Sequence, residues 1–421
     1  MIRILFIHPN LPGQFLNICL LLRRLPGVEV FFISNPNSNH IHNICRIDLP
    51  PPESGSPIAV LEARGVATAN ALRELCAAGK RPDLILAHPA WGDTVFLKIV
   101  DPSIPLICLP EWYAQTDGGM DRFIMAQAYP IEVKVALLRS FQEHNLAALK
   151  AAADADRLVV PTQFQRAQFP RFLQDHLTVL HEGISDDFYA LERAAVAPEA
   201  MDIGSRQVDG RAGIVTFVTR SLEPLRGYPQ FLEAARIVRQ RRPKTVFLVA
   251  GNEQNGGYLP CPVAGLPWRR YLEQSCPQDD DHYIFLGLLN RQAYQQVLMA
   301  STVHVYLTGP YVLSWSLVEA MAAGCAIVAS ATPPVMEVLE HEKSALLVPF
   351  EDAVALADAM ERVLDGDAGP IEHMRHNARL AARRYQASRV TPLLAELIAD
   401  TLGEERSGEL RAALRAACTP T

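Results

Sequence analysis

Two arginines, Arg220 and Arg226, lie six residues apart in TRSLEPLRGY, directly after an apolar run. A guanidinium carries several N–H donors in a planar fork, and two of them near one strand end would bind a diphosphate. The same charges would stabilise a departing phosphate group. Surface arginines in a solvated loop would give the same pattern, so both interpretations stay open at this point.

A second candidate anion site is PYVLSWSLVEAMAAGC, which spans residues 310–325. Two hydroxyl residues, Ser314 and Ser316, precede an Ala-rich helical stretch, and the N-terminus of a helix attracts anions. Ser316 and Glu319 also have the spacing of a capping box, in which Glu319 would only hold the Ser316 amide. A helix that begins at Ser314 would instead leave Glu319 for a ligand hydroxyl.

The first half of the chain offers polar groups in loops that follow apolar runs. Gly13 in HPNLPGQF would let the backbone approach a ligand, although no GxGxxG fingerprint is present. The other candidates are His8, His88, Glu111 and Asp117, with Trp91 and Trp112 beside them. Each polar group could act as acid, base or hydroxyl-binding group, or be solvated, and each tryptophan could form a ligand wall or belong to the core.

Metal-binding patterns are weak. Asp279, Asp280 and Asp281 stand in a polar stretch typical of a solvated loop, and the histidines lack HExxH spacing. We therefore expect neither a required metal nor a separate cofactor.

The elements that must position these residues are short, continuous apolar runs separated by helix-like segments. The runs are 2–7, 28–34, 84–88, 105–109, 157–162 and 177–183, then 213–220, 245–251, 283–289, 303–309, 326–330 and 345–349. Such strands alternating with helices predict parallel sheets covered on both faces, and two series predict an α/β chain with two doubly wound, Rossmann-like domains.

We expect domains at 1–190 and 213–385, a polar linker at 191–212, and a helical tail at 386–421 that packs back on the first domain. Ligands of open parallel sheets bind beyond the carboxyl ends of the strands, where the candidate residues of both halves lie. The pattern therefore predicts a site in a cleft between two facing domains.

Composition limits the function classes. The 421 residues are 49% hydrophobic and 20% charged, with a formal net charge of -7, which argues against general nucleic-acid binding. The eight cysteines form no CxxC pair and predict reduced thiols in a cytoplasmic protein. The N-terminus is not typical of a signal peptide and no apolar stretch reaches membrane-spanning length, although peripheral contact with the inner membrane face is left open.

Several motifs together resemble the family 4 glycosyltransferases, retaining enzymes with the GT-B fold. They are TRSLEPLRGY, FLVAGN, SLVEAMAAGCAIVAS, PPVMEVLEHEKSALLVPFED and, in the first half, RLVVPTQFQRAQF. HPNLPGQF and SWSLVEAM are similar to a subgroup with HPNxPGQF and SWSLxEAM motifs. The resemblance covers most of the chain and is strongest over 213–350.

The resemblance implies a retaining, metal-independent transfer of sugar from a nucleotide-diphosphate sugar, which the second domain would bind. Arg220 and Arg226 match the basic pair on the donor diphosphate, and Glu319 matches the glutamate on the ribose. The expected donor-binding residues are Gly13, Gly251, Asn252, Tyr311, Leu313, Ser314, Trp315, Ser316 and Glu319. The expected catalytic residues are His88, Glu111, Arg220 and Arg226.

Two departures from the family pattern concern the sugar. The family's E-x7-E begins with an acid where this chain has Tyr311, and a first-domain strand that usually ends in histidine ends here in Leu-Pro-Glu-Trp, with Glu111. The acceptor stays open among glycan, lipid, small molecule and protein. Two other functions also stay open: a nucleotide-sugar epimerase, and a binding protein without catalysis.

Overall fold

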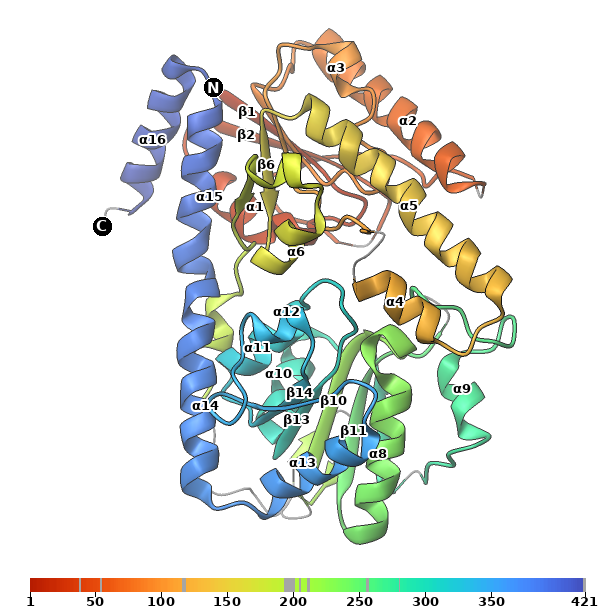
Figure 1. Cartoon of the computed structure of the whole chain (residues 1–421). Helices are drawn as coiled ribbons and strands as arrows, with labels where there is room; N and C mark the ends of the chain where they lie inside the picture. Colours follow the sequence, from red (N-terminus) through yellow and green to blue (C-terminus); the bar gives the residue numbers. More distant parts are fainter. Residues whose placement is uncertain are drawn as a thin grey trace. The chain divides into compact units, whose positions relative to one another are not determined.

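The computed structural model describes residues 1–37, 39–53, 55–115, 119–192, 201–203, 206–209, 213–254, 257–279 and 281–418 (Figure 1). The chain forms two compact units, which we treat separately. The first unit contains Met1–Gly183 and Ala387–Thr421, and the second contains Ile184–Gln386. The C-terminal segment, blue in Figure 1, thus belongs with the N-terminal residues and not with the residues that directly precede it in the chain.

The first unit is built on a seven-stranded parallel sheet. Its strands are β1 (Ile2–Ile7), β2 (Val28–Ser34), β3 (Cys45–Asp48), β4 (Leu84–Ala87), β5 (Leu106–Cys108), β6 (Arg157–Val160) and β7 (Leu177–Val179). The order is β3-β2-β1-β4-β5-β6-β7, so the chain reverses its direction of travel across the sheet between β1 and β4. Ile4 of β1 pairs with Val30 on one side and Leu84 on the other.

Helices cover both faces of this sheet. They are η1 (Gly13–Phe15), α1 (Leu16–Leu22), α2 (Pro57–Ala77), α3 (Leu97–Val100), α4 (Gly119–Ala126), α5 (Ile131–Asp154), α6 (Gln163–Gln168), α7 (Arg171–Gln174), α15 (Ala387–Thr401) and α16 (Glu404–Cys418). Leu394 and Ile398 of α15 join Phe6 and Phe15 in one buried cluster. The C-terminal helices therefore complete the core of the first unit.

The second unit contains a six-stranded parallel sheet. Its strands are β10 (Ile214–Ser221), β11 (Val246–Asn252), β12 (Tyr283–Gly287), β13 (Val303–Tyr306), β14 (Ile327–Ser330) and β15 (Leu346–Val348), in the order β12-β11-β10-β13-β14-β15. Here the reversal falls between β10 and β13. Both sheets are doubly wound, as the two series of apolar runs predict.

The helices of the second unit fall into two groups. They are η2 (Asp186–Phe188), η4 (Pro224–Arg226), α8 (Tyr228–Arg241), α9 (Trp268–Glu273), α10 (Arg291–Ala300), α11 (Trp315–Ala322), α12 (Pro333–Met336), α13 (Ala353–Asp365), α14 (Ala368–Ala382) and η5 (Arg383–Tyr385). Phe231 of α8 and Met360 of α13 share one core cluster, whereas Leu317 of α11 and Ala378 of α14 share another.

Three strands differ from the sequence prediction. The β3 segment CRID is short, polar and largely accessible, so it lacks the apolar run that marks the other strands of its sheet. The antiparallel pair β8 (Met201–Ile203) and β9 (Arg206–Val208) lies in the stretch predicted as a plain linker. Much of that linker lies outside the described residues.

None of the helices that the structure describes is both long and apolar enough to cross a membrane.

Candidate active site

The candidate residues gather where each sheet reverses. In the second unit Arg220 and Arg226 follow β10, and Ser314 and Glu319 follow β13. These two strands are neighbours at the reversal, where diverging loops leave room for a ligand. In the first unit the loops after β1 and β4 carry the histidines. Candidate residues that follow different strands in the sequence thus lie near the same end of the sheet in each unit.

Arg226 is held in place by the loop that follows β13. Its Nη1 donates to Oγ1 of Thr308 at 2.9 Å and to the carbonyl oxygen of Val312 at 3.2 Å. Thr308 is itself buried and bonded to Ser330. Within the described part of the chain, the Nη2 and Nε groups of Arg226 donate no hydrogen bond. A buried, oriented guanidinium therefore keeps donors for an anion.

Arg220 is exposed and makes no hydrogen bond or ion pair among the described residues. Its charge nevertheless acts on the same carboxylate as that of Arg226. Burial raises the pKa of Glu223, and the charges of Arg226 and Arg220 oppose this rise. The two arginines therefore share one electrostatic neighbourhood, one anchored and the other solvated.

Helix α11 begins at Ser314, not at Ser316. Ser314 is the N-cap, with Oγ accepting from the Ser316 amide at 3.4 Å and lying 3.0 Å from the Ser316 hydroxyl oxygen. The capping box predicted as one alternative is therefore wrong, because Glu319 lies five residues beyond the cap. Glu319 is left with its carboxylate on the side of the helix.

The amides of this turn are largely used within the protein. The Ser314 amide donates to the Tyr306 hydroxyl at 2.9 Å, and the Leu317 amide donates to the Ser314 carbonyl oxygen at 3.2 Å. Leu313 is buried in the core, whereas Ser314, Trp315 and Ser316 are partly exposed. The turn offers the helix dipole and its two serine hydroxyls to an anion more than it offers free amides.

Glu319 has an unusual environment for a carboxylate. Burial raises its pKa to about 7, and the negative charge of Asp187 acts in the same direction. Tyr294 and Arg291 oppose the rise. The buried Tyr294 hydroxyl acts through a hydrogen bond to the carboxylate, and Arg291 acts through its charge. Glu319 therefore changes protonation near neutral pH, and a ligand hydroxyl would meet either form.

Tyr311 does not stand in for the missing acid. It is 6% exposed, and its ring packs edge-on against Tyr258 with centroids 4.9 Å apart. The Arg226 guanidinium carbon lies 5.5 Å from the centroid of the same ring, a cation–π distance. Tyr311 thus packs against the arginine with its ring and offers no carboxylate there.

Gly251 and Asn252 have structural contacts of their own. Gly251 has a φ of 154°, and a Cβ there would lie 2.6 Å from the Thr219 carbonyl oxygen. The Asn252 side chain accepts from the Gln254 amide at 3.0 Å, which stabilises the turn after β11. Both residues shape the strand end. Their contacts do not indicate a role in binding the nucleotide-sugar donor.

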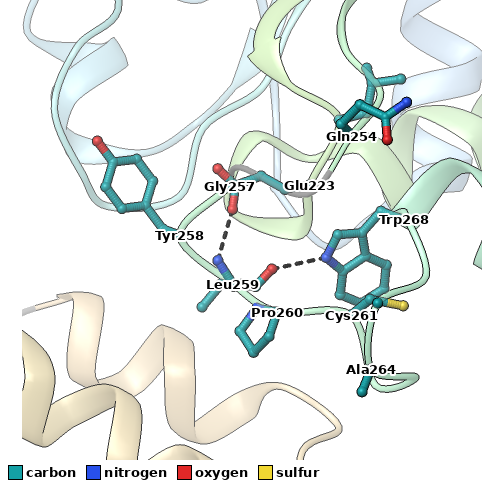
Figure 2. Close-up of a pocket in the computed structure, with 11 residues that line it drawn as sticks. Glu223, Gln254, Gly257, Tyr258, Leu259, Pro260, Cys261, Ala264 and Trp268 are labelled. Atoms are coloured by element: carbon teal, nitrogen blue, oxygen red, sulfur yellow. Dashed lines mark hydrogen bonds between the residues drawn. The ribbon is translucent and has the colours of Figure 1, made fainter. Parts of the chain in front are cut away.

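A pocket of about 470 Å³ lies next to the arginine loop in the second unit (Figure 2). Its lining comes from Leu222 and Glu223, from Gln254, and from Gly257, Tyr258, Leu259, Pro260, Cys261, Ala264, Gly265 and Trp268. Glu223 Oε2 accepts from the Leu259 amide at 2.9 Å, and the Trp268 indole donates to the Leu259 carbonyl oxygen at 2.9 Å. No sequence motif predicts this pocket.

In the first unit Gly13 lies against His8. Its φ is 53°, and a Cβ would lie 2.5 Å from His8 Nδ1, so the position requires glycine on two counts. Nδ1 of His8 lies 2.9 Å from the Asn10 amide nitrogen, while its Nε2 is buried without a hydrogen-bond partner among the described residues. Burial, assisted by His88, lowers the pKa of His8 to about 3, so the ring is neutral.

His88 and Glu111 come together as a pair. Nε2 of His88 lies 3.6 Å from Oε2 of Glu111, and the ring of His88 contacts those of His8 and Trp91, with centroids 5.3 and 4.7 Å away. Nδ1 of His88 accepts from the Ala90 amide at 3.4 Å, which leaves Nε2 to carry a proton toward Glu111. Trp91 therefore belongs to this cluster.

The loop that carries Glu111 is anchored at two points. Gln165 donates to the Glu111 carbonyl oxygen at 2.7 Å, and the Asn145 side chain bonds both the amide and the carbonyl of Ala114 at 2.8 Å. The Trp112 ring contacts that of Phe164, with centroids 5.9 Å apart. Asp117, another sequence candidate, lies outside the described residues. The carboxylate of Glu111 is thus presented from a fixed backbone.

Sequence reasoning missed a buried ion pair behind this cluster. Arg64 Nε donates to Asp93 Oδ1 at 2.6 Å, and both side chains are at most 2% exposed. Arg64 also donates to Asn35. The pair ties α2 to the loop after β4, which also carries His88. Arg64 gave no signal because it lies inside a helix, remote in sequence from any strand end.

Among the described residues, no group of three or more His, Cys, Asp or Glu side chains is arranged to hold a metal ion.

Two family models match different parts of the chain. Residues 26–188 match the family described as "Glycosyl transferase family 4 group", and residues 204–384 match "Glycosyl transferases group 1". A curated relative, D-inositol 3-phosphate glycosyltransferase of Saccharomonospora viridis, is 26% identical over 275 residues. The match covers 63% of this chain and 60% of that relative's length.

Solved structures share the fold at low identity. Sucrose-phosphate synthase from Thermosynechococcus elongatus superposes with a TM-score of 0.68 at 17% identity, covering 94% of this chain and 98% of that one. HepE from Anabaena, solved in complex with UDP-glucose, gives a TM-score of 0.62 at 15% identity, covering 95% and 100%. These likenesses, the two family matches and the two parallel-sheet units identify a GT-B protein that resembles the family 4 glycosyltransferases.

Proposed function

We propose that this chain is a retaining glycosyltransferase that moves a sugar from a nucleotide-diphosphate sugar to an acceptor hydroxyl without a metal ion. The observation that carries the proposal is Arg226: a buried guanidinium, fixed by Thr308 and Val312, with Nη2 and Nε still available at the reversal of the second sheet. The matches to glycosyltransferase families over both halves of the chain support it.

The second unit would hold the nucleotide part of the donor. Arg226 and the exposed Arg220 would bind the diphosphate, and the N-terminus of α11 would add its dipole and the hydroxyls of Ser314 and Ser316. The Glu319 carboxylate would accept hydrogen bonds from ribose hydroxyls. HepE, a structural neighbour, has been solved with UDP-glucose, which supports this class of ligand.

The first unit would supply the groups that meet the acceptor. The Glu111 carboxylate, paired with His88, would accept a hydrogen bond from the hydroxyl of the acceptor substrate. Its negative charge would also stabilise positive charge on the sugar ring. In the transfer, the bond from the anomeric carbon to phosphate oxygen breaks and a bond to the acceptor oxygen forms on the same face. The acceptor proton leaves with the diphosphate, so no enzyme nucleophile is needed.

The test is a calorimetric screen of UDP-, GDP- and ADP-sugars against wild type, Arg226→Ala and Glu319→Ala. We expect the sugars of one nucleotide (UDP, GDP or ADP) to bind the wild-type protein, and we expect both substitutions to weaken that binding. Binding that neither substitution changes would refute the site.

Turnover separates the rival functions. Transfer predicts release of nucleoside diphosphate when a suitable acceptor is present. An epimerised nucleotide sugar formed without any acceptor would instead identify an epimerase. Binding without release for every acceptor offered would identify a non-catalytic binding protein.

A further inference from the structure

The pocket between Glu223 and Trp268 is a built feature of the second unit (Figure 2). The Leu259 peptide is clamped from both sides, since Glu223 accepts from its amide and Trp268 donates to its carbonyl oxygen. A Cβ at Gly257 would lie 2.5 Å from the Glu223 carboxylate, so only glycine permits this approach. The pocket walls are therefore set before any ligand arrives.

The lining suits a polar, uncharged ligand. It includes the carboxylate of Glu223, the amide of Gln254, the rings of Tyr258 and Trp268, and the thiol of Cys261. None of the described lining residues is a lysine or arginine, so a phosphate would find no cation and one carboxylate there. A purely apolar ligand would leave the polar groups unmatched. A sugar ring has hydroxyls that can bond the polar lining groups and an apolar face that can contact the aromatic rings.

The pocket adjoins the position where this chain lacks the first acid of the family motif. Tyr258, from its wall, packs against the Tyr311 ring, and that ring in turn supports Arg226. Glu223 lies three residues before Arg226 and interacts electrostatically with it. A ligand in the pocket would therefore lie beside the arginine that binds the diphosphate.

We propose that this pocket binds a neutral sugar ring, with Glu223 and Gln254 bonding its hydroxyls and Trp268 contacting its apolar face. Glu223 can do so because a carboxylate accepts up to four hydrogen bonds, of which the Leu259 and Tyr258 amides take two. The sugar comes either from the donor or from the acceptor. The inference rests on the proposed function. The experiment below distinguishes the donor from the acceptor as the source of the sugar.

Cys261 reports occupancy because this residue lines the pocket and is partly exposed. The rate of its alkylation by iodoacetamide is followed by peptide mass spectrometry, with exposed Cys45 of the first unit as the internal control. Three additions are compared: UDP, GDP or ADP alone, the corresponding glucose and mannose conjugates, and methyl glucoside or methyl mannoside. At ten times Kd, an occupying ligand slows alkylation about tenfold.

Each outcome decides something. Protection by a nucleotide sugar beyond that given by its bare nucleotide assigns the pocket to the donor sugar, and protection by a methyl glycoside alone assigns it to an acceptor sugar. If neither protects Cys261 while a bare nucleotide still binds through Arg226, the pocket proposal is overturned and the proposed function stands. If a glycoside protects but no nucleotide binds, the proposed function fails and the pocket proposal stands.

A substitution gives independent support. Ala264 lines the pocket, is exposed and takes no part in the clamp, so Ala264→Phe should fill the pocket without unfolding its wall. Val263→Phe is the matched control, because exposed Val263 does not line the pocket. We expect Ala264→Phe alone to abolish the protection of Cys261 by sugar, with bare-nucleotide affinity unchanged. Equal protection in both variants would contradict the proposal.

Discussion

The two sheet edges of this protein have the same topology but opposite chemistry. At the reversal of the first sheet lie a neutral His8, Trp91 and the His88–Glu111 pair. At the reversal of the second lie Arg226, Arg220 and the N-terminus of a helix. Topology places a site at each edge, but side-chain charge decides the ligand. The second edge suits a diphosphate, whereas the first suits hydroxyl groups.

Removing the anchored arginine should have the largest effect on this contrast. For Arg226→Ala we expect nucleoside-diphosphate affinity to fall about 100-fold or more, because a buried charge partner of the phosphate is lost. Arg220→Ala should cost about fivefold, since an exposed charge is screened by solvent. Calorimetry measures both, with thermal unfolding to verify that each variant folds. Similar losses in the two variants would contradict the distinction between anchored and solvated arginine.

Substitutions at the edge of the first sheet should lower turnover and leave nucleotide binding unchanged. For Glu111→Gln and His88→Gln we expect kcat to fall about 100-fold, within the range for positioned acid–base groups. The bare-nucleotide Kd should stay unchanged in both variants. Steady-state release of nucleoside diphosphate measures the first quantity and calorimetry the second. A kcat equal to that of wild type would remove Glu111 and His88 from the mechanism.

The raised pKa of Glu319, about 7, predicts pH-dependent nucleotide binding. In the proposed site only the ionised carboxylate would accept hydrogen bonds from both ribose hydroxyls, so affinity should rise as pH increases from 6 to 8, by about tenfold if one charge-assisted bond is gained. Phosphate ionisation also contributes, and Glu319→Gln retains that contribution alone. The variant should therefore show a smaller rise than wild type. Identical pH profiles would exclude Glu319 as the titrating group.

A glycine substitution sharpens the comparison by destabilising one unit only. Gly13→Ala should lower the free energy of unfolding by about 2–4 kcal/mol, combining positive-φ strain with a clash against His8. Gly79→Ala is the matched control, because Gly79 also has a positive φ of 73° but nothing lies within 4 Å of its Cβ position. Chemical denaturation measures both. Equal losses would show that His8 does not constrain this position.

The sequence predicts most of the architecture because both sheets are parallel and buried. Their strands are continuous apolar runs, and β1 and β2 begin and end where the runs do. Strand β3 escapes prediction because its residues are polar and it pairs along one side only. The hairpin β8–β9 escapes because no apolar run marks it.

The candidate site is only partly readable from sequence. Local spacing identifies Arg220, Arg226 and Glu319, but two helix starts fit the serines, and only the backbone decides for Ser314. The pocket between Glu223 and Trp268 and the Arg64–Asp93 ion pair both depend on contacts between segments that are distant in the sequence. No local pattern encodes such contacts, because each partner has an ordinary neighbourhood in the sequence.

The central claim is that the second unit binds the nucleotide and that the first does not. The most direct test is a parallel calorimetric titration of bare UDP, GDP and ADP into Arg226→Ala and Glu111→Gln. We predict that the nucleotide bound by wild type loses its binding to Arg226→Ala and binds Glu111→Gln with unchanged Kd. Unchanged binding to Arg226→Ala, or loss of binding to Glu111→Gln, would contradict the account.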